Sequence, residues 1–259
     1  MITVIIMDNN IEEIKKLSKQ IKCPGIGNNI EHLLMIGRAE HMSLSEYTVN
    51  LLKCELENRI SNKTTRRLSD GAFPTMKYLE DFDFTKYSKN VSENLLYISS
   101  LEFIAENKDV VLTGNAGSGK TFIAIATGIK AVLNGYSVYY VSAPILALKM
   151  QEALKKDELS SFFRKMMKYD LLIIDNLGLS TFTKEHVELL FSLIDARNGR
   201  KSTILISIYE LKDWDSIFGN KVVTSAIVDR LIYLSYAIDM SLETSVRFIE
   251  TIKWQKGKN

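Results

Sequence analysis

The stretch Val110-Val111-Leu112-Thr113-Gly114-Asn115-Ala116-Gly117-Ser118-Gly119-Lys120-Thr121 decides the fold of this 259-residue chain. Its first three residues form an apolar run typical of a buried strand, and a helical pattern begins at Lys120 or Thr121. Gly114 to Thr121 match the pattern GxxxxGK[ST] in the strand–loop–helix context that this pattern requires. The sequence therefore predicts a phosphate-binding loop.

The residue types in this loop suit the chemistry of phosphate binding. Glycines allow the backbone to curl so that successive N–H groups point at phosphate oxygens, and the helix amino terminus adds a favourable dipole. We expect Lys120 to reach the β- and γ-phosphates and the Thr121 hydroxyl to coordinate Mg²⁺. The predicted nucleotide contacts are Gly114, Asn115, Ala116, Gly117, Ser118, Gly119, Lys120 and Thr121.

A second strand ends in a carboxylate. The run Leu171-Leu172-Ile173-Ile174 is apolar throughout and is followed by Asp175, as in a Walker-B strand that carries its carboxylate to the metal side of a nucleotide. An apolar run that ends in aspartate is more often an ordinary buried strand. It indicates a Walker-B strand here only because the chain also contains the phosphate-binding loop. We predict ATP and Mg²⁺ as cofactors, with Thr121 and Asp175 on the metal.

The second part of the chain has the pattern of a parallel α/β sheet. Short apolar runs alternate with segments long enough for crossover helices. The runs are Val110-Leu112, Val138-Val141, Leu171-Ile174, Thr203-Ile206 and roughly Ile232-Ile238. They predict an α/β fold with a sheet of five parallel strands in a P-loop nucleotide-binding core.

The first part of the chain is expected to be helical. Apolar residues recur at helical spacing over residues 8 to 22, and Cys23-Pro24-Gly25 then predicts a turn. Ser43 and Glu46 form a capping-box pattern at the start of a further helix. Gly71 and Pro74 interrupt the polar segment that follows. We therefore place a helical N-terminal domain at 1–72 and the nucleotide-binding core at 73–259.

Composition excludes several classes of protein. Hydrophobic residues make up 46% and charged residues 25%, which fits neither a disordered nor a collagen-like chain. No run is long enough to span a membrane, and Met1-Ile6 is too short for a secretion signal, so we expect a cytoplasmic protein without a membrane partner. The formal net charge is only +2, so any DNA-binding surface must be local.

Further motifs carry a family resemblance. They are Leu79-Glu80-Asp81-Phe82-Asp83-Phe84, Ser202-Thr203-Ile204, Trp214 with Phe218-Gly219, and Ala226-Ile227-Val228-Asp229-Arg230-Leu231. With these residues the chain resembles the IstB/DnaC-like branch of AAA+ ATPases, and most closely the IstB-type helper ATPases of insertion-sequence transposons. A phosphate-binding loop alone would leave many families open, whereas the first and last of these motifs are specific.

The resemblance implies a five-stranded AAA+ core behind a small helical domain, ATP-driven self-association on double-stranded DNA, and contact with a transposase. Arg230 matches the family's arginine finger, which reaches the γ-phosphate held by a neighbouring subunit, while a surface ion pair with Asp229 is the plainer alternative. Arg247 resembles the sensor-2 arginine, although its segment lacks the family's glycine and is one residue longer.

Two departures from the family pattern concern hydrolysis. Asn176 follows Asp175 where the family has Asp or Glu, and an amide orients water but does not accept its proton. Ile208 aligns with the polar sensor-1 residue, unless a one-residue slip gives that role to Ser207. With Asp175, Asn176, Arg230 and Arg247 as the catalytic set, we expect an ATP-binding assembly switch with slow or absent turnover.

Basic residues cluster where related proteins line the DNA path, namely Lys149, Lys155, Lys156, Arg164, Lys165 and Lys168. Their alternative interpretation is a solvated helix face. The leading hypothesis is a transposition helper that assembles on DNA and recruits or activates a transposase. The alternatives are a DnaC-like helicase loader and a nonhydrolysing ATP-dependent DNA scaffold.

Overall fold

The computed structural model describes residues 2–179, 182–219, 224–225, 228–229, 231 and 235–241, with side chains from residue 10 onward. By its contacts the chain divides into two compact units, Met1–Arg66 and Arg67–Asn259.

The first unit is built from three helices, α1 (Ile2–Gln20), α2 (Pro24–Ala39) and the greater part of α3 (Leu44–Asp70). The predicted turn lies at residues 21–23, between α1 and α2. Pro24 then begins α2, because proline is suited to the first turn of a helix, where its missing N–H costs nothing. Glu55 of α3 accepts a hydrogen bond of 2.7 Å from the Gly25 N–H and one of 2.6 Å from Arg59 Nε. This buried carboxylate therefore attaches the start of α2 to α3.

The start of α3 confirms the capping box. The Glu46 N–H donates to Ser43 Oγ at 3.3 Å, and the Ser43 N–H donates to Glu46 Oε2 at 2.8 Å. The helix then continues through the polar segment to Asp70. Arg67 donates to the Gly135 carbonyl and the Tyr140 N–H donates to the Gly71 carbonyl, so the contact-based division falls ahead of the predicted 72/73 boundary.

The second unit contains the predicted sheet of five parallel strands. The strands are β1 (Val110–Thr113), β2 (Val138–Ser142), β3 (Leu171–Leu177), β4 (Ser202–Ser207) and β5 (Tyr236–Asp239), in the order β2-β3-β4-β1-β5. The register pairs Val111 with Leu205 across β1 and β4, and Ser142 with Asp175 across β2 and β3. Residues 232–234, which were expected to begin the last strand, lie outside the described residues.

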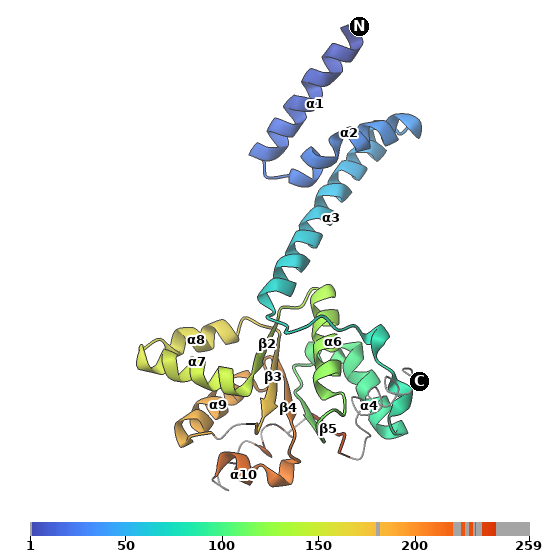
Figure 1. The fold of residues 1–259 in the computed structure, drawn as a ribbon. Coiled ribbons are helices and arrows are strands. Elements are labelled where there is room, and N and C mark those ends of the chain that lie inside the picture. The colour runs from blue at the N-terminus through green and yellow to red at the C-terminus, as the bar shows by residue number, and fades with distance from the viewer. Residues whose placement is uncertain are drawn as a thin grey trace, which may run out of the picture. The chain divides into compact units, whose positions relative to one another are not determined.

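Helices cover both faces of this sheet (Figure 1). One face carries α4 (Lys89–Ser100) and α6 (Lys120–Leu133), and the other carries α7 (Ala143–Lys155), α8 (Leu159–Met166) and α9 (Lys184–Arg197). Alternate residues of each strand enter the two apolar layers, so that Leu112 belongs to the first and Val111 to the second. Burial on both faces explains why the strands are continuous apolar runs.

Short elements connect these layers. They are the 3-10 turns η1 (Leu79–Asp81), η2 (Phe84–Lys86) and η3 (Leu211–Asp213) and the helices α5 (Glu102–Ala105) and α10 (Asp215–Phe218). Among the described residues, no helix is both long enough and apolar enough to cross a membrane.

A buried polar network lies at the amino ends of the strands. The Thr203 N–H donates to Asp109 Oδ1 at 2.7 Å, and Arg197 donates to the carbonyls of Ser202 and Met166, each at 2.7 Å. Arg197 is only 1% exposed, and these acceptors compensate its charge for the loss of water. The network therefore stabilises the amino ends of the strands, at the end of the sheet opposite the phosphate-binding loop.

Candidate nucleotide-binding site

The phosphate-binding loop connects β1 to α6 at the carboxyl ends of the strands. Lys120, which is 5% exposed, folds back over the loop. Its ammonium donates to the Gly114 carbonyl at 2.6 Å, to the Asn115 carbonyl at 2.7 Å and to Ser118 Oγ at 3.2 Å. A buried ammonium needs such acceptors. Phosphate oxygens would replace some of them when a nucleotide enters the loop.

The metal-side pair predicted from the sequence is brought together. The Thr121 hydroxyl donates to Asp175 Oδ2 at 2.9 Å, and Asp175 is 1% exposed. The Asn176 N–H donates to Asp175 Oδ1 at 2.6 Å. The carboxylate is thus held at the end of β3, directly beside the first turn of α6.

These groups fit Mg²⁺. No cluster of three or more His, Cys, Asp or Glu side chains occurs in the part of the chain that the structure describes, so an all-protein metal cage is absent there. Mg²⁺ at nucleotide sites is bound by one or two protein oxygens, with waters and phosphates completing its octahedron. The hydroxyl of Thr121 and the carboxylate of Asp175 supply oxygens of this kind.

A tyrosine that the sequence motifs did not single out completes the carboxylate's environment. The Tyr140 hydroxyl on β2 donates to Asp175 Oδ2 at 2.6 Å. Burial, followed by the hydrogen bond to Asp175, raises the pKa of Tyr140, so its hydroxyl keeps its proton at neutral pH. No local sequence signal marks this contact, because it depends on β2 lying next to β3 in the sheet.

Asn176 follows Asp175 on β3, and Ser207 and Ile208 lie at the end of the neighbouring strand β4. Asn176 has a left-handed backbone, with φ of 63°, at an irregularity in the pairing of β3 with β4. Ser207 is fully buried, and its hydroxyl donates to the Leu177 carbonyl at 3.2 Å and accepts from the Tyr209 N–H at 3.1 Å. These backbone contacts engage the Ser207 hydroxyl, and Ile208 has no polar side-chain group to offer.

The Leu79–Phe84 motif packs on the phosphate-binding loop through aromatic side chains. The Phe82 ring stacks on Tyr87 at 5.1 Å between centroids and lies 5.4 Å from the Phe122 ring of α6. The Tyr87 hydroxyl donates to the Ser118 carbonyl at 3.1 Å. The linker ahead of the core is therefore part of the wall of the site.

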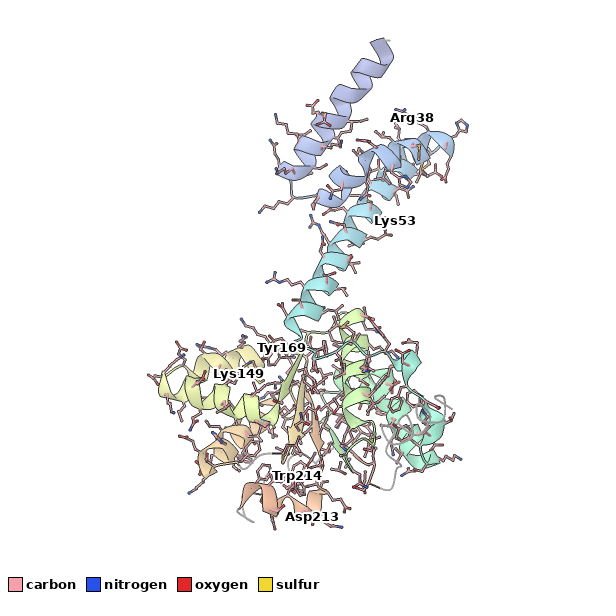
Figure 2. All side chains as sticks on the ribbon, in the orientation of Figure 1. Arg38, Lys53, Lys149, Tyr169, Asp213 and Trp214 are labelled. Atoms are coloured by element: carbon pink, nitrogen blue, oxygen red, sulfur yellow. The ribbon has the colours of Figure 1, made fainter. Side chains whose placement is uncertain are left out.

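The predicted basic cluster lies on α7, α8 and the adjoining loops, and all six side chains are exposed. Among the described residues, none of the six belongs to an ion pair. The Lys149 ammonium donates to the Tyr139 hydroxyl at 2.8 Å. Figure 2 shows Lys149 on the α7–α8 side of the sheet and Trp214 at the end where α10 lies. Arg230 and Arg247 lie outside the described residues.

Comparisons with known proteins agree with this geometry. A family model described as IstB-like ATP binding protein matches residues 16–250. An insertion sequence IS232 protein of Bacillus thuringiensis subsp. berliner, named for ATP binding, is 29% identical over 88% of this chain and 91% of its own length. Its IS21 counterpart from Pseudomonas aeruginosa is 28% identical, covering 90% of this chain and 88% of its own.

Solved structures share the fold. AMPPCP-bound DnaA from Aquifex aeolicus superposes with a TM-score of 0.57 at 22% identity, covering 71% of this chain and 56% of that one. The structure of DnaI superposes with a TM-score of 0.54 at 20% identity, covering 63% of this chain and 90% of that one. At these identities the likeness concerns the AAA+ core alone, and it confirms the predicted fold class.

Proposed function

The chain belongs to the family of IstB-like ATP-binding proteins, and from this premise we propose that it is a transposition helper that binds double-stranded DNA. In this proposal ATP drives self-association on DNA, and the assembly recruits or activates a transposase. Nucleotide binding is proposed because Lys120, Thr121 and Asp175 lie together at one end of the sheet. The role in transposition is proposed because insertion-sequence proteins match about nine-tenths of this chain.

Each of these three residues has a defined task. Lys120 exchanges its carbonyl partners for phosphate oxygens and binds them through charge-assisted hydrogen bonds. Thr121 and Asp175 hold Mg²⁺, which, when bound, neutralises charge on the phosphates. The N–H groups at the start of α6 provide a further favourable field for anions.

We propose slow turnover as the second part of the function. Asn176 has no carboxylate to accept a proton from an attacking water, and Ile208 has no polar group to position that water. Nucleotide binding needs neither group. The bound nucleotide then acts as a long-lived signal for assembly, and a nonhydrolysing scaffold is the limiting form of the same proposal.

The DNA surface is proposed for the exposed basic residues of α7 and α8. Six exposed cations on these two helices and the adjoining loops suit phosphate contacts, which carry little sequence information. The charge of the whole chain is nearly balanced, so a local surface of this kind is needed. Binding is therefore expected to be steeply salt-dependent and to vary little with sequence.

The first experiment tests the nucleotide site by calorimetric titration with ATP and Mg²⁺. Lys120→Ala removes charge-assisted contacts worth about 1.5–3 kcal/mol, which is roughly one to two decades in affinity. An unchanged affinity in this variant would refute the site.

The second experiment tests the DNA surface with two unrelated duplexes over a salt series in the presence of ATP. For the wild type, the logarithm of the DNA affinity should fall linearly with the logarithm of the salt concentration, with a slope of about 0.9 per phosphate contacted. The slope should be about equal for both duplexes. Lys155→Glu with Lys156→Glu should lower that slope, whereas the charge-matched control, Lys89→Glu with Lys184→Glu on α4 and α9, should leave it unchanged. A flat salt dependence, or a strong preference for one duplex, would contradict the proposal.

A further inference from the structure

Tyr140 is the buried group with the most direct contact to the nucleotide site that no motif explains. It is 9% exposed and lies on β2, whereas the phosphate-binding loop follows β1 and Asp175 lies on β3. Its hydroxyl oxygen is 2.6 Å from Asp175 Oδ2, which is shorter than the 2.9 Å between that atom and Thr121. A short O–H···O⁻ distance indicates a charge-assisted hydrogen bond.

The sheet register explains why this contact forms. Tyr140 pairs with Ile173, and Ser142 pairs with Asp175. Side chains two residues apart on a strand point to the same face, so Tyr140 is a diagonal neighbour of Asp175 on the face that α6 covers. Tyr139 points to the opposite face, where it stacks on Tyr169 at 5.0 Å.

The carboxylate is held on both oxygens. Oδ1 accepts from the Asn176 N–H, and Oδ2 accepts from Thr121 and from Tyr140. Thr121 can move when its oxygen coordinates a metal ion. The Tyr140 ring, packed in the apolar layer beside α6, cannot move without disturbing that layer. The phenol is therefore the donor that keeps Asp175 in one orientation.

We propose that Tyr140 is a positioning residue that holds the Asp175 carboxylate ready for Mg²⁺, and so sets how strongly Mg²⁺ strengthens nucleotide binding. The inference rests on the proposed nucleotide site. It assigns no contact between Tyr140 and the nucleotide itself. Removal of a hydrogen-bond partner behind a metal ligand typically weakens metal affinity 10- to 100-fold.

The test measures ATP affinity in Mg²⁺ and in EDTA for the wild type and for Tyr140→Phe. The phenylalanine keeps the ring and removes only the hydroxyl. We expect the ratio of the two affinities to fall about 10-fold in the variant, with the affinity in EDTA within about twofold of wild type. Tyr139→Phe, one residue away on the other face, is the matched control and should keep the wild-type ratio.

Two results would overturn the inference. An unchanged ratio in Tyr140→Phe would mean that the hydroxyl does not act on the metal side, and an equal loss of affinity in Mg²⁺ and EDTA would mean that it only supports folding of the site. Failure of the proposed function has a different signature, because the wild type would then bind ATP no better than Lys120→Ala does.

A double-mutant cycle tests whether Tyr140 acts through Asp175. In an Asp175→Asn background, Tyr140→Phe should cause no further change in the ratio of the ATP affinity in Mg²⁺ to that in EDTA. The reason is that the carboxylate that the phenol positions is already gone. Additive losses in the double variant would place the effect of Tyr140 elsewhere and would also overturn the inference.

Discussion

Asn176 combines an unusual backbone with an unusual residue type for its position. Its φ of 63° lies in the left-handed region, which asparagine and aspartate adopt more readily than most residues. Asn176→Asp therefore introduces a carboxylate without a new backbone cost. General-base assistance is typically worth about 10²- to 10⁴-fold, and with Ile208 unable to position water we expect the lower end of that range. Phosphate release at saturating ATP measures the gain.

The control for this prediction is the double variant Lys120→Ala with Asn176→Asp. It should return phosphate release to the baseline at an ATP concentration that saturates Asn176→Asp but not a protein whose ATP affinity is about one to two decades lower. Brisk phosphate release by the wild type would contradict the assignment of a slow switch.

Asp109 gives the core a predictable pH dependence. Burial raises the pKa of Asp109 to about 6, although the Thr203 N–H and Arg197 oppose that rise. The folded protein therefore retains a proton that the unfolded chain releases from about pH 4 upward. Stability contributed by this group is present below pH 4 and is lost as the pH rises through 6, by at most about 3 kcal/mol.

Asp109→Asn tests this dependence because an amide does not titrate and its oxygen can still accept from the Thr203 N–H. Arg197 stays charged throughout, since burial lowers its pKa only to about 10. In urea unfolding, the wild type should lose about 1–3 kcal/mol relative to the variant between pH 4 and pH 7. Parallel pH profiles would show that Asp109 does not titrate in this window.

The sequence allowed some of these residues to be predicted and not others. Lys120 and Thr121 belong to a local motif, and Asp175 ends an apolar strand, so chain order alone was enough. Tyr140 could not be found in this way, because its contact depends on β2 lying next to β3 in the sheet. Arg197 ends an amphipathic helix, where arginine is usually exposed, and only tertiary packing buries it.

At the scale of elements, the linker and the phosphate-binding loop form one packed unit around Gly119. This glycine precedes α6 with φ of 95°, and a Cβ there would overlap the Tyr87 hydroxyl. Gly119→Ala should therefore weaken ATP binding. It should also lower the free energy of unfolding by more than the roughly 1–2 kcal/mol that a left-handed backbone costs a non-glycine residue. Calorimetry and urea unfolding measure the two effects.

Gly199→Ala separates the two causes. Gly199 has φ of 67° and no atom within 4 Å of a Cβ, so alanine there adds backbone strain without overlap. Adding Tyr87→Phe to Gly119→Ala removes the overlapping hydroxyl and should recover part of the loss. If Gly119→Ala and Gly199→Ala were equally destabilised, the contact between Tyr87 and the loop would be unimportant.

Element prediction from the sequence succeeded where the pattern was local and strong. The first four strands begin and end within three residues of their predicted apolar runs. Because helices cover both faces of the sheet, each strand is a continuous apolar run whose ends are easy to recognise in the sequence. The start of α2 was missed because Pro24 and Gly25 suggest a turn. The irregular Leu79–Phe84 linker has no periodicity and takes its shape from packing against the loop.

At the scale of the whole molecule, a nucleotide held at one surface can serve as part of a contact between subunits. If Arg230 reaches a neighbour's γ-phosphate, each subunit presents a loop on one surface and a finger on another. Such a head-to-tail interface is heterologous and generates a ring or a filament. Assembly then depends on ATP even when hydrolysis is slow, which suits the combination of an intact Lys120 with Asn176.

The last prediction separates nucleotide binding from assembly. Arg230→Ala should leave the ATP affinity of the monomer nearly intact while weakening ATP-dependent oligomers on DNA, because it deletes a charge-assisted bond worth about 1.5–3 kcal/mol at each interface. Lys120→Ala should lose both properties. Light scattering with ATP and duplex DNA measures the oligomers, and calorimetry measures the affinity.

Mixing the two variants sharpens this test. An interface forms only where an intact loop meets an intact finger, so a mixture of Arg230→Ala and Lys120→Ala should give complexes shorter than those of the wild type. A finger that acted on its own subunit's nucleotide would instead leave the mixture with no functional interface. Assembly of Arg230→Ala at the wild-type level would show that Arg230 is a surface residue, since an interface that loses a charged bond to phosphate cannot keep its full strength.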